Sequence, residues 1–403
     1  MRLLVAGDPR SIHAARFAGL LQELGHEVHV FAVEPQYEQE EHLRGVTLHV
    51  ALAYRRPAGG NRVAGPGAWL APLCEPPVAR RVVTQVLHRL SAPGRVRGAA
   101  RLSRTLAELR PGLVFSLKMQ NEGYAVARAR AAMGADFPAP WIHFSWGTDI
   151  EYFGKHPDER GLHLPLIRDL LARCDFHAAD TERDLAAAAV LGFGGVTLGA
   201  MPAFGGFELD GLRRLRAQAP ARDTLLVKGR HGGYVGKALR VLEAIRLRPQ
   251  AVRGRRVRIF MATREVAVAA QALRADLGID CAVLPRLGYE ELLAWYGRSL
   301  AAVSATDVDG TPAFLLEAMA MGALPVHSDM ASLREWVAHG KNGLLFHVDD
   351  VPALADCLER ALADGALREA AALENWRLID ERADRAKLRE RLRGWIAQAA
   401  PGR

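Results

Sequence analysis

Short apolar runs alternate with longer amphipathic stretches along most of the chain. Each short run is typical of a strand buried on both faces, and the stretch after it repeats its apolar positions with the period of a helix. Alternating strands and helices predict parallel sheets that are covered by helices on both faces. The predicted strands span residues 2–6, 26–33, 113–117, 141–145, 225–229 and 257–262.

The length favours two such domains, because 403 residues are too many for one doubly wound sheet. Residues 201–223 are rich in proline and glycine and precede the predicted strand that begins at Leu225, so we expect the domain boundary there. The predicted fold class is therefore α/β with two doubly wound domains. The expected parts are residues 1–205, residues 206–373 and a charged terminal helix within 374–403 that packs on the first domain.

The composition is that of an ordinary globular protein. Half of the residues are hydrophobic and 24% are charged, which excludes a disordered chain, a collagen-like fibre and a coiled coil. No stretch approaches the roughly 18 apolar residues of a membrane-spanning helix, and residues 1–10 turn polar too soon for a secretory signal. The 4 cysteines lack the spacing of zinc ligands or of a disulfide framework. We therefore expect a cytoplasmic protein with no bound metal and no cofactor.

The charge balance adds a question about partners. A net charge of +8 favours polyanions, whether phosphate, anionic lipid or nucleic acid. Between Arg80 and Arg110 the arginines far outnumber the single acid, Glu108, and valine and leucine lie between them. This pattern is typical either of a face that contacts the anionic inner surface of a membrane or of a solvated helix in an arginine-rich protein. We expect no nucleic acid partner, because aromatic interleaving and a known module are missing.

Residues 301–346 carry the clearest chemical signal. A short apolar strand leads into a tight turn, and Pro312 is well placed for the first turn of a helix. Doubly wound sheets bind ligands at the carboxyl ends of their strands, and the free amides of a helix N-terminus favour an anion such as a diphosphate. In this turn Gly310 allows a close approach of the backbone, and Thr311 adds a hydroxyl donor.

Two acids flank the turn. Asp309 lies in the turn and Glu317 lies in the helix, so their carboxylates could accept hydrogen bonds from sugar hydroxyls at the two ends of one extended ligand. The alternative is a capped helix whose Glu317 faces solvent. The apolar neighbours of Glu317 oppose this alternative, because a carboxylate among apolar residues is costly without a partner.

The same segment resembles a known family. The acid-Gly-x-Pro pattern at 309–312, followed by Leu-Leu-Glu-Ala-Met-Ala at 315–320 and Gly-Leu-Leu-Phe at 343–346, is similar to the C-terminal domain of the retaining family-four glycosyltransferases. The resemblance implies the GT-B fold, in which two Rossmann-like domains face each other across a cleft. It implies transfer of a sugar from a nucleotide-diphosphate donor, most simply a UDP-sugar, to a hydroxyl of a saccharide, a glycolipid or a small molecule, without a metal.

The resemblance also implies roles for the two acids. In that family both are usually Glu, the second binds the ribose hydroxyls and the first contacts the donor sugar. These roles fall on Glu317 and Asp309, and Asp309 is one methylene shorter than the usual residue.

Residues 225–246 resemble the family's basic loop between a strand and a helix, where two cations clamp the donor diphosphate. Lys228 and Lys237 match best, and Arg230 is a rival to Lys228 because the loop is rearranged here. The alternative is that these are surface residues. Apart from the resemblance, a leaving diphosphate needs cations when no metal is present.

Residues 283–299 resemble the segment that frames the nucleobase. The resemblance implies that the backbone around Arg286 and Leu287 reads the base edge and that Tyr289 covers the base. Such a role leaves little signature in the side chains.

The N-terminal domain opens with a strand, a loop and a helix over 7–31 but lacks the GxGxxG fingerprint, which counts against a dinucleotide dehydrogenase. The resemblance implies that the loop around His13 lines the donor phosphate and the acceptor. Alternatively, Ser11 caps the helix and His13 belongs to its first turn. Asp149, after the strand at 141–145, is a candidate contact of the acceptor hydroxyl or else a helix cap.

Asp307 and Asp309 spell the DxD metal motif of the other major transferase fold. We interpret this match as coincidental, because a glutamate follows Asp309 eight residues later on the predicted helix and both halves of the chain are Rossmann-like. The resemblance implies a reaction in which the leaving phosphate oxygen helps to deprotonate the acceptor. Two other functions stay open. They are a GT-B nucleotide-sugar epimerase, which would need acid and base residues across the cleft, and a catalytically silent nucleotide-sugar-binding protein.

Overall fold

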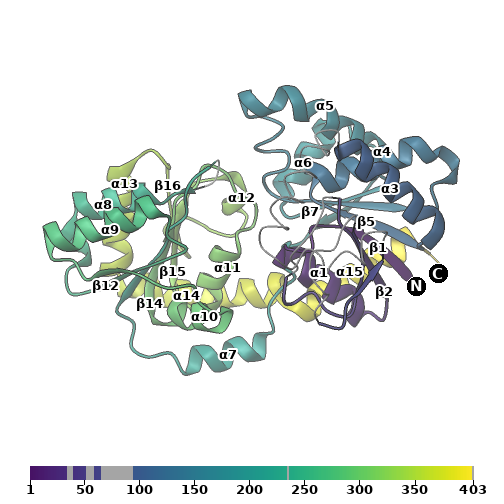
Figure 1. The fold of residues 1–403 in the computed structure, drawn as a ribbon. Helices are drawn as coiled ribbons and strands as arrows, with labels where there is room; N and C mark the ends of the chain where they lie inside the picture. Colours follow the sequence, from purple (N-terminus) through teal and green to yellow (C-terminus); the bar gives the residue numbers. More distant parts are fainter. Residues whose placement is uncertain (34–39, 51–58, 65–93, 234–235, 402–403) are drawn as a thin grey trace, which may run out of the picture. The chain divides into compact units, whose positions relative to one another are not determined.

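The computed structural model describes residues 1–33, 40–50, 59–64, 94–233 and 236–401. The chain divides into two compact units (Figure 1). The first unit comprises Met1–Gly206 with Ala386–Arg403, and the second comprises Phe207–Arg385.

The first unit is built on one parallel sheet. Its order within the described residues is β4-β3-β2-β1-β5-β6-β7-β8, and each neighbouring pair is parallel. The central strands are buried along almost their whole length, as the continuous apolar runs predict. The strands are β1 (Arg2–Ala6), β2 (Glu27–Phe31), β3 (Thr47–His49), β4 (Arg62–Ala64), β5 (Leu113–Leu117), β6 (Trp141–Ser145), β7 (Phe176–Ala179) and β8 (Val196–Ala200).

Helices cover both faces of this sheet. One apolar cluster joins Phe17 on the first helix to Phe115 on β5 and Leu392 near the C-terminus, and another joins Leu102 and Leu170 to the opposite face. The helical segments of this unit are α1 (Ile12–Glu23), α3 (Gly94–Leu109), η2 (Met119–Gly123), α4 (Tyr124–Met133), η3 (Gly134–Asp136), α5 (Pro157–Arg173), α6 (Glu182–Val190) and α15 (Arg385–Ala399).

The second unit repeats the design with the strand order β13-β12-β9-β14-β15-β16, again parallel throughout. Its strands are β9 (Thr224–Lys228), β12 (Arg256–Phe260), β13 (Cys281–Val283), β14 (Ser299–Ser304), β15 (Leu324–Ser328) and β16 (Leu344–Phe346), with a small hairpin of β10 (His231–Gly232) and β11 (Gly236–Lys237). Its helical segments are α7 (Leu209–Ala217), α8 (Ala238–Leu247), η4 (Pro249–Val252), α9 (Arg264–Leu277), α10 (Tyr289–Arg298), α11 (Ala313–Met321), α12 (Ala331–Arg334), α13 (Val351–Ala363) and α14 (Gly365–Ala383).

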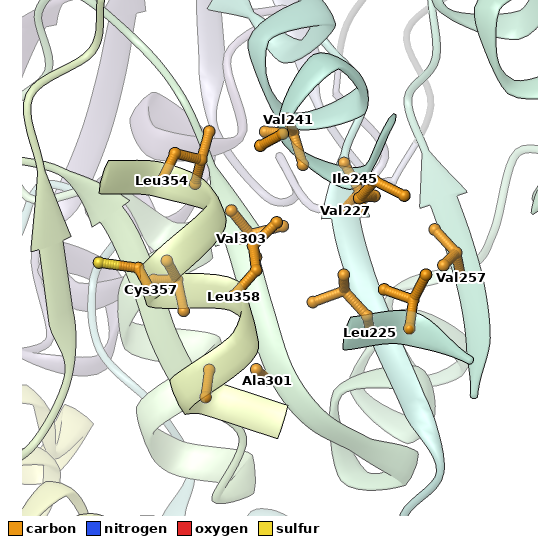
Figure 2. Packing of buried hydrophobic residues seen from close by; sticks show 14 of the residues in the cluster. Leu225, Val227, Val241, Ile245, Val257, Ala301, Val303, Leu354, Cys357 and Leu358 are labelled. Carbon is orange, nitrogen blue, oxygen red and sulfur yellow. The ribbon is translucent and has the colours of Figure 1, made fainter. Parts of the chain in front are cut away.

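The core of the second unit fixes the strands from which the candidate site projects. Val227 of β9 and Val303 of β14 are paired in the sheet, and Figure 2 shows them in one apolar layer with Val241 of α8 and Leu358 of α13. All four side chains are almost fully buried. Because β9 and β14 are adjacent in this packed layer, the loops that follow them emerge at the same edge of the sheet.

The terminal segment differs from the single helix that the sequence predicts. The chain forms α14 and α15 with a break at Asp384, whose backbone is extended. Phe207 donates its N–H to the carbonyl of Ala383 at 2.9 Å, and Arg385 donates to the carbonyl of Phe207 at 3.0 Å. This bridge replaces the helical hydrogen bonds at the break. Leu388 and Leu392 of α15 then pack in the core of the first unit.

The basic segment at 80–110 is described from residue 94 onward. Leu102 and Leu106 of α3 are fully buried in the core, and Arg101 donates to the carbonyl oxygens of Ala32 and His49. Leu102 and Leu106 therefore pack in the core of the first unit and do not form an exposed apolar face. None of the described helices has the length and apolar character needed to cross a membrane.

Candidate functional site

The turn between β14 and α11 has the local structure that the sequence predicts. Pro312 lies directly before the helix with an extended backbone, at φ −66° and ψ 131°, so its missing N–H leaves no helical bond unmade. Gly322 ends the helix at φ 77°, a left-handed conformation that glycine adopts without strain. The helix between them is buried from Phe314 to Met321.

Hydrogen bonds hold this turn from two sides. Gly310 donates its N–H to Oδ1 of Asp309 at 2.9 Å, and the hydroxyl of Ser332 donates to the carbonyl of Asp309 at 2.9 Å. Thr306 donates its N–H to Oγ of Ser328 at 2.9 Å. These hydrogen bonds fix the turn that precedes the N-terminus of α11.

Glu317 is a buried carboxylate in α11. It is 7% exposed, so the alternative of a solvent-facing Glu317 is wrong. Its neighbour Tyr296, on α10, is completely buried. Burial and the adjacent Glu317 carboxylate raise the pKa of Tyr296 well above its usual value, so its hydroxyl keeps its proton.

Lys228 is the last residue of β9 and is half-buried. Its Nζ lies 5.8 Å from the centroid of the Phe314 ring, which is in the first turn of α11. Burial and then the charge of Lys228 lower the pKa of His327, on β15, to about 3, so this imidazole is neutral. Lys228 thus lies near the start of α11, whereas its rival Arg230 is exposed.

Lys237 is also brought to the turn. Its backbone N–H donates to the carbonyl of Ala305 at 3.0 Å, and its Nζ lies 2.9 Å from Oδ2 of Asp307. The chain between Lys228 and Lys237 forms the β10–β11 hairpin, with residues 234–235 outside the described residues. Two of the predicted cations therefore lie near the turn that carries Asp309.

The two acids of the DxD match have different protein partners. The carboxylate of Asp307 is paired with Lys237, whereas the carboxylate of Asp309 accepts the N–H of Gly310. Among the described residues, the one cluster of potential metal ligands is at 40–42 in the first unit.

The loop predicted to frame the nucleobase lies at the surface. Arg286 is exposed, and Leu287 and Tyr289 are half-buried. Gly288 donates its N–H to the Glu291 carboxylate at 2.9 Å, which caps the start of α10. The cap fixes the loop at its C-terminal end. The proposed contact with a base stays a prediction.

Asp149 in the first unit is an internal anchor. It is 1% exposed, and its Oδ2 accepts the N–H of Met119 at 2.9 Å and that of Trp146 at 2.8 Å. Burial raises the pKa of Asp149 to about 8, against the opposing effect of the two amides. Because the next helix, α5, begins at Pro157, the alternative of a helix-capping Asp149 is wrong.

His13 lies in the first turn of α1. The hydroxyl of Ser11 accepts the N–H of Ala14 at 3.4 Å, so Ser11 caps this helix. The ring of His13 meets that of Trp146 edge to face, with centroids 5.4 Å apart. The loops after β1 and β6, which the sequence separates widely, thus meet at His13.

Charged residues cluster after β1 and β5. In the sequence, Lys118 and Glu122 are further candidates for the acceptor side, because they follow a predicted strand. Nζ of Lys118 lies 3.4 Å from Oε2 of Glu122, and Lys118 has a left-handed backbone with φ 59°. Burial raises the pKa of Glu122 to about 7 despite this lysine. Asp8, directly after β1, has a pKa lowered by hydrogen bonds from Arg10 that outweigh its burial. The signal available in the sequence is that both segments directly follow adjacent parallel strands.

Residues 239–375 match the family model described as glycosyl transferases group 1. The segment 301–346, which carries the motif, lies inside the matched range. No curated protein matches the chain.

Solved structures match nearly the whole chain. The HepE protein of Anabaena in complex with UDP is 13% identical, with a TM-score of 0.65 over 98% of this chain and 99% of that one. Sucrose-phosphate synthase from Thermosynechococcus elongatus is 16% identical, with a TM-score of 0.70 over 98% of each chain. An E. coli structure named trehalose-6-phosphate, bound with UDP-2-fluoro glucose, is 15% identical, with a TM-score of 0.69 over 99% of each chain. These likenesses confirm the predicted GT-B fold.

Proposed function

We propose that this chain, a glycosyltransferase of the GT-B fold with a group 1 domain over residues 239–375, transfers a sugar from a UDP-sugar to a hydroxyl group with retention of configuration. The observation that carries the proposal is the preformed turn before α11, where buried Gly310 and Thr311 precede a helix N-terminus and Lys237 is held beside it. Complexes of the Anabaena protein with UDP, UDP-glucose and glucose support a nucleotide-sugar donor and a saccharide acceptor.

The donor contacts follow from the chemistry of these groups. The helix dipole and free amides at the start of α11 favour the diphosphate, and the ammonium groups of Lys228 and Lys237 offset the charge that develops on the leaving nucleotide. Glu317 accepts hydrogen bonds from the ribose, and Asp309 contacts the donor sugar. Burial of Glu317 supports its role, because a buried carboxylate gains most from a hydroxyl partner.

The reaction needs no metal in this proposal. The lysine ammonium groups supply the positive charge, and the pairing of Asp307 with Lys237 removes one carboxylate from the DxD match. The leaving phosphate oxygen takes part in deprotonating the acceptor, so the protein supplies orientation and electrostatics.

On the acceptor side, His13 and Asp149 position the loops that meet the acceptor hydroxyl. The two backbone amides bound by Asp149 and the ring contact between His13 and Trp146 support this role, because they fix the loops after β5 and β6. The acceptor is a saccharide, a glycolipid or a small molecule.

The proposal includes the location of the protein in the cell. The protein is cytoplasmic in this proposal, and the segment Arg80–Arg110 contacts the anionic inner face of the membrane. Exposed Arg104 and Arg110 support the contact. Cosedimentation with anionic liposomes that is lost at high salt is expected, and no binding at low salt would overturn this part of the proposal.

Product analysis tests the function. The chain is incubated with UDP-sugars, with and without a panel of saccharide acceptors, and released UDP and the donor are measured. Release of UDP that requires an acceptor supports transfer. A converted donor without an acceptor indicates an epimerase instead, and UDP binding without donor consumption indicates a silent binding protein.

A further inference from the structure

Asp307 and Lys237 form an ion pair between the start of α8 and the turn before α11. The two atoms Nζ and Oδ2 are 2.9 Å apart, and the side chains are 36% and 39% exposed. The backbone N–H of Lys237 also donates to Ala305, two residues before Asp307. Two attachments therefore hold this lysine on the turn, one through its backbone and one through its ammonium group.

The backbone around Lys237 is closely packed. A Cβ atom at Gly236 would lie 2.6 Å from the carbonyl oxygen of Arg230, so a larger residue does not fit there without a shift. The N–H of Ala238 donates to the same carbonyl at 3.3 Å. The backbone is thus fixed on both sides of Lys237. The position of the ammonium group then depends on the rotamer of the lysine side chain.

We propose that Asp307 is a positioning residue that holds the ammonium group of Lys237 where it meets the donor diphosphate. This inference rests on the proposed function. A lysine loses much rotamer freedom when it is fixed, and a partner already in place removes that loss from the binding step. An ammonium group has three donors, so it can keep Asp307 and still donate to phosphate oxygens.

Asp307 could also weaken donor binding, because its carboxylate competes with the phosphates for the ammonium group of Lys237. An ion pair this exposed is weak because water and salt screen it. The screening limits both the hold of Asp307 on Lys237 and its repulsion of the donor. The backbone hydrogen bond from Lys237 to Ala305 keeps the lysine beside the turn, so positioning is expected to outweigh competition.

The test compares Asp307→Ala with Asp307→Asn, with Asp349→Asn as the control. Asp349 is an exposed acid in the turn before α13, and its Oδ1 lies 3.8 Å from a guanidinium nitrogen of Arg240 on α8. Its variant therefore removes one negative charge near α8 without removing the partner of Lys237. KM and kcat for UDP-glucose are measured together with the Kd of UDP.

Asp307→Ala is expected to raise KM and the Kd of UDP about threefold, as fits an exposed ion pair, and to lower kcat by a similar factor, because Lys237 also meets the charge that develops on the leaving nucleotide. Asp307→Asn keeps an acceptor oxygen for Lys237 and is expected to recover most of the affinity, and Asp349→Asn is expected to match the unchanged protein. In a Lys237→Ala background the Asp307→Ala change is expected to have no further effect.

A lower or unchanged Kd of UDP in Asp307→Ala, or full additivity with Lys237→Ala, overturns the inference, while acceptor-dependent release of UDP by the unchanged protein would leave the proposed function intact. Failure of the unchanged protein to bind UDP at all overturns the proposed function and the inference with it.

Discussion

Tyr296 on α10 lies beside Glu317 on α11, with both side chains buried and the Tyr296 pKa raised by burial and by that carboxylate. A phenol that keeps its proton can donate a hydrogen bond to the carboxylate. The two helices are neighbours in the second unit, so we expect Tyr296 to orient Glu317 from within the fold.

Removal of the phenol hydroxyl tests this relationship. Tyr296→Phe is expected to weaken UDP binding about fivefold, because Glu317, the proposed ribose ligand, would lose a neighbour that is expected to orient it. Isothermal titration with UDP measures the change, and the melting temperature shows whether the fold is retained. An unchanged Kd would contradict the orienting role.

Lys228 and Arg230 are distinguished by their own variants. Lys228→Ala is expected to lower kcat about a hundredfold, because a cation near the start of α11 is lost from the developing phosphate charge. Arg230→Ala is the matched control and is expected to change kcat less than about threefold, since this side chain is exposed. Reversed effects of the two variants would assign the role to Arg230.

Metal removal separates the two interpretations of the DxD match. Release of UDP is expected to be unchanged, within about twofold, in excess EDTA, because Lys237 supplies the charge beside Asp307. Complete loss of activity that Mn²⁺ restores would identify the two aspartates as metal ligands.

The buried Asp149 predicts a dependence of stability on pH. Burial raises its pKa from 3.8 to about 8 in the folded chain, so between these pH values the folded state holds a proton that the unfolded state has lost. This group therefore stabilises the fold less as the pH rises from 4 to 8. Asp149→Asn is expected to reduce the fall in melting temperature between pH 5 and pH 8 by about 4 °C.

Other groups also titrate between pH 5 and pH 8. The experiment therefore compares the slope of melting temperature against pH in the Asp149→Asn variant with the slope in the unchanged chain. Glu122, whose pKa is about 7, contributes to both proteins alike. Identical slopes for the Asp149→Asn variant and the unchanged chain would show that the carboxyl is charged in the fold at neutral pH.

Local patterns predicted several strands and the local structure of the turn before α11. The strands β1, β5 and β6 have the predicted bounds, because each apolar run lies within the buried part of the sheet. The turn and helix from Asp309 to Gly322 likewise depend on residues close in sequence, among them Pro312 before the helix and glycine after it.

Contacts between distant segments could not be predicted in this way. The pairing of Lys237 with Asp307 depends on the packing of the hairpin beside β14, and that of Tyr296 with Glu317 depends on how α10 meets α11. The break at Asp384 depends on a bridge to Phe207. Periodicity describes one segment at a time and carries no information about such partners.

Binding of UDP and of pyrophosphate to Glu317→Ala tests the ribose and phosphate assignments most directly. If Glu317 holds the ribose and the turn holds the phosphates, this variant loses at least about tenfold in affinity for UDP and keeps its affinity for pyrophosphate. Glu243→Gln, at an exposed acid on α8, serves as the control and is expected to bind both ligands normally. Unchanged affinity of Glu317→Ala for UDP would contradict the assignment.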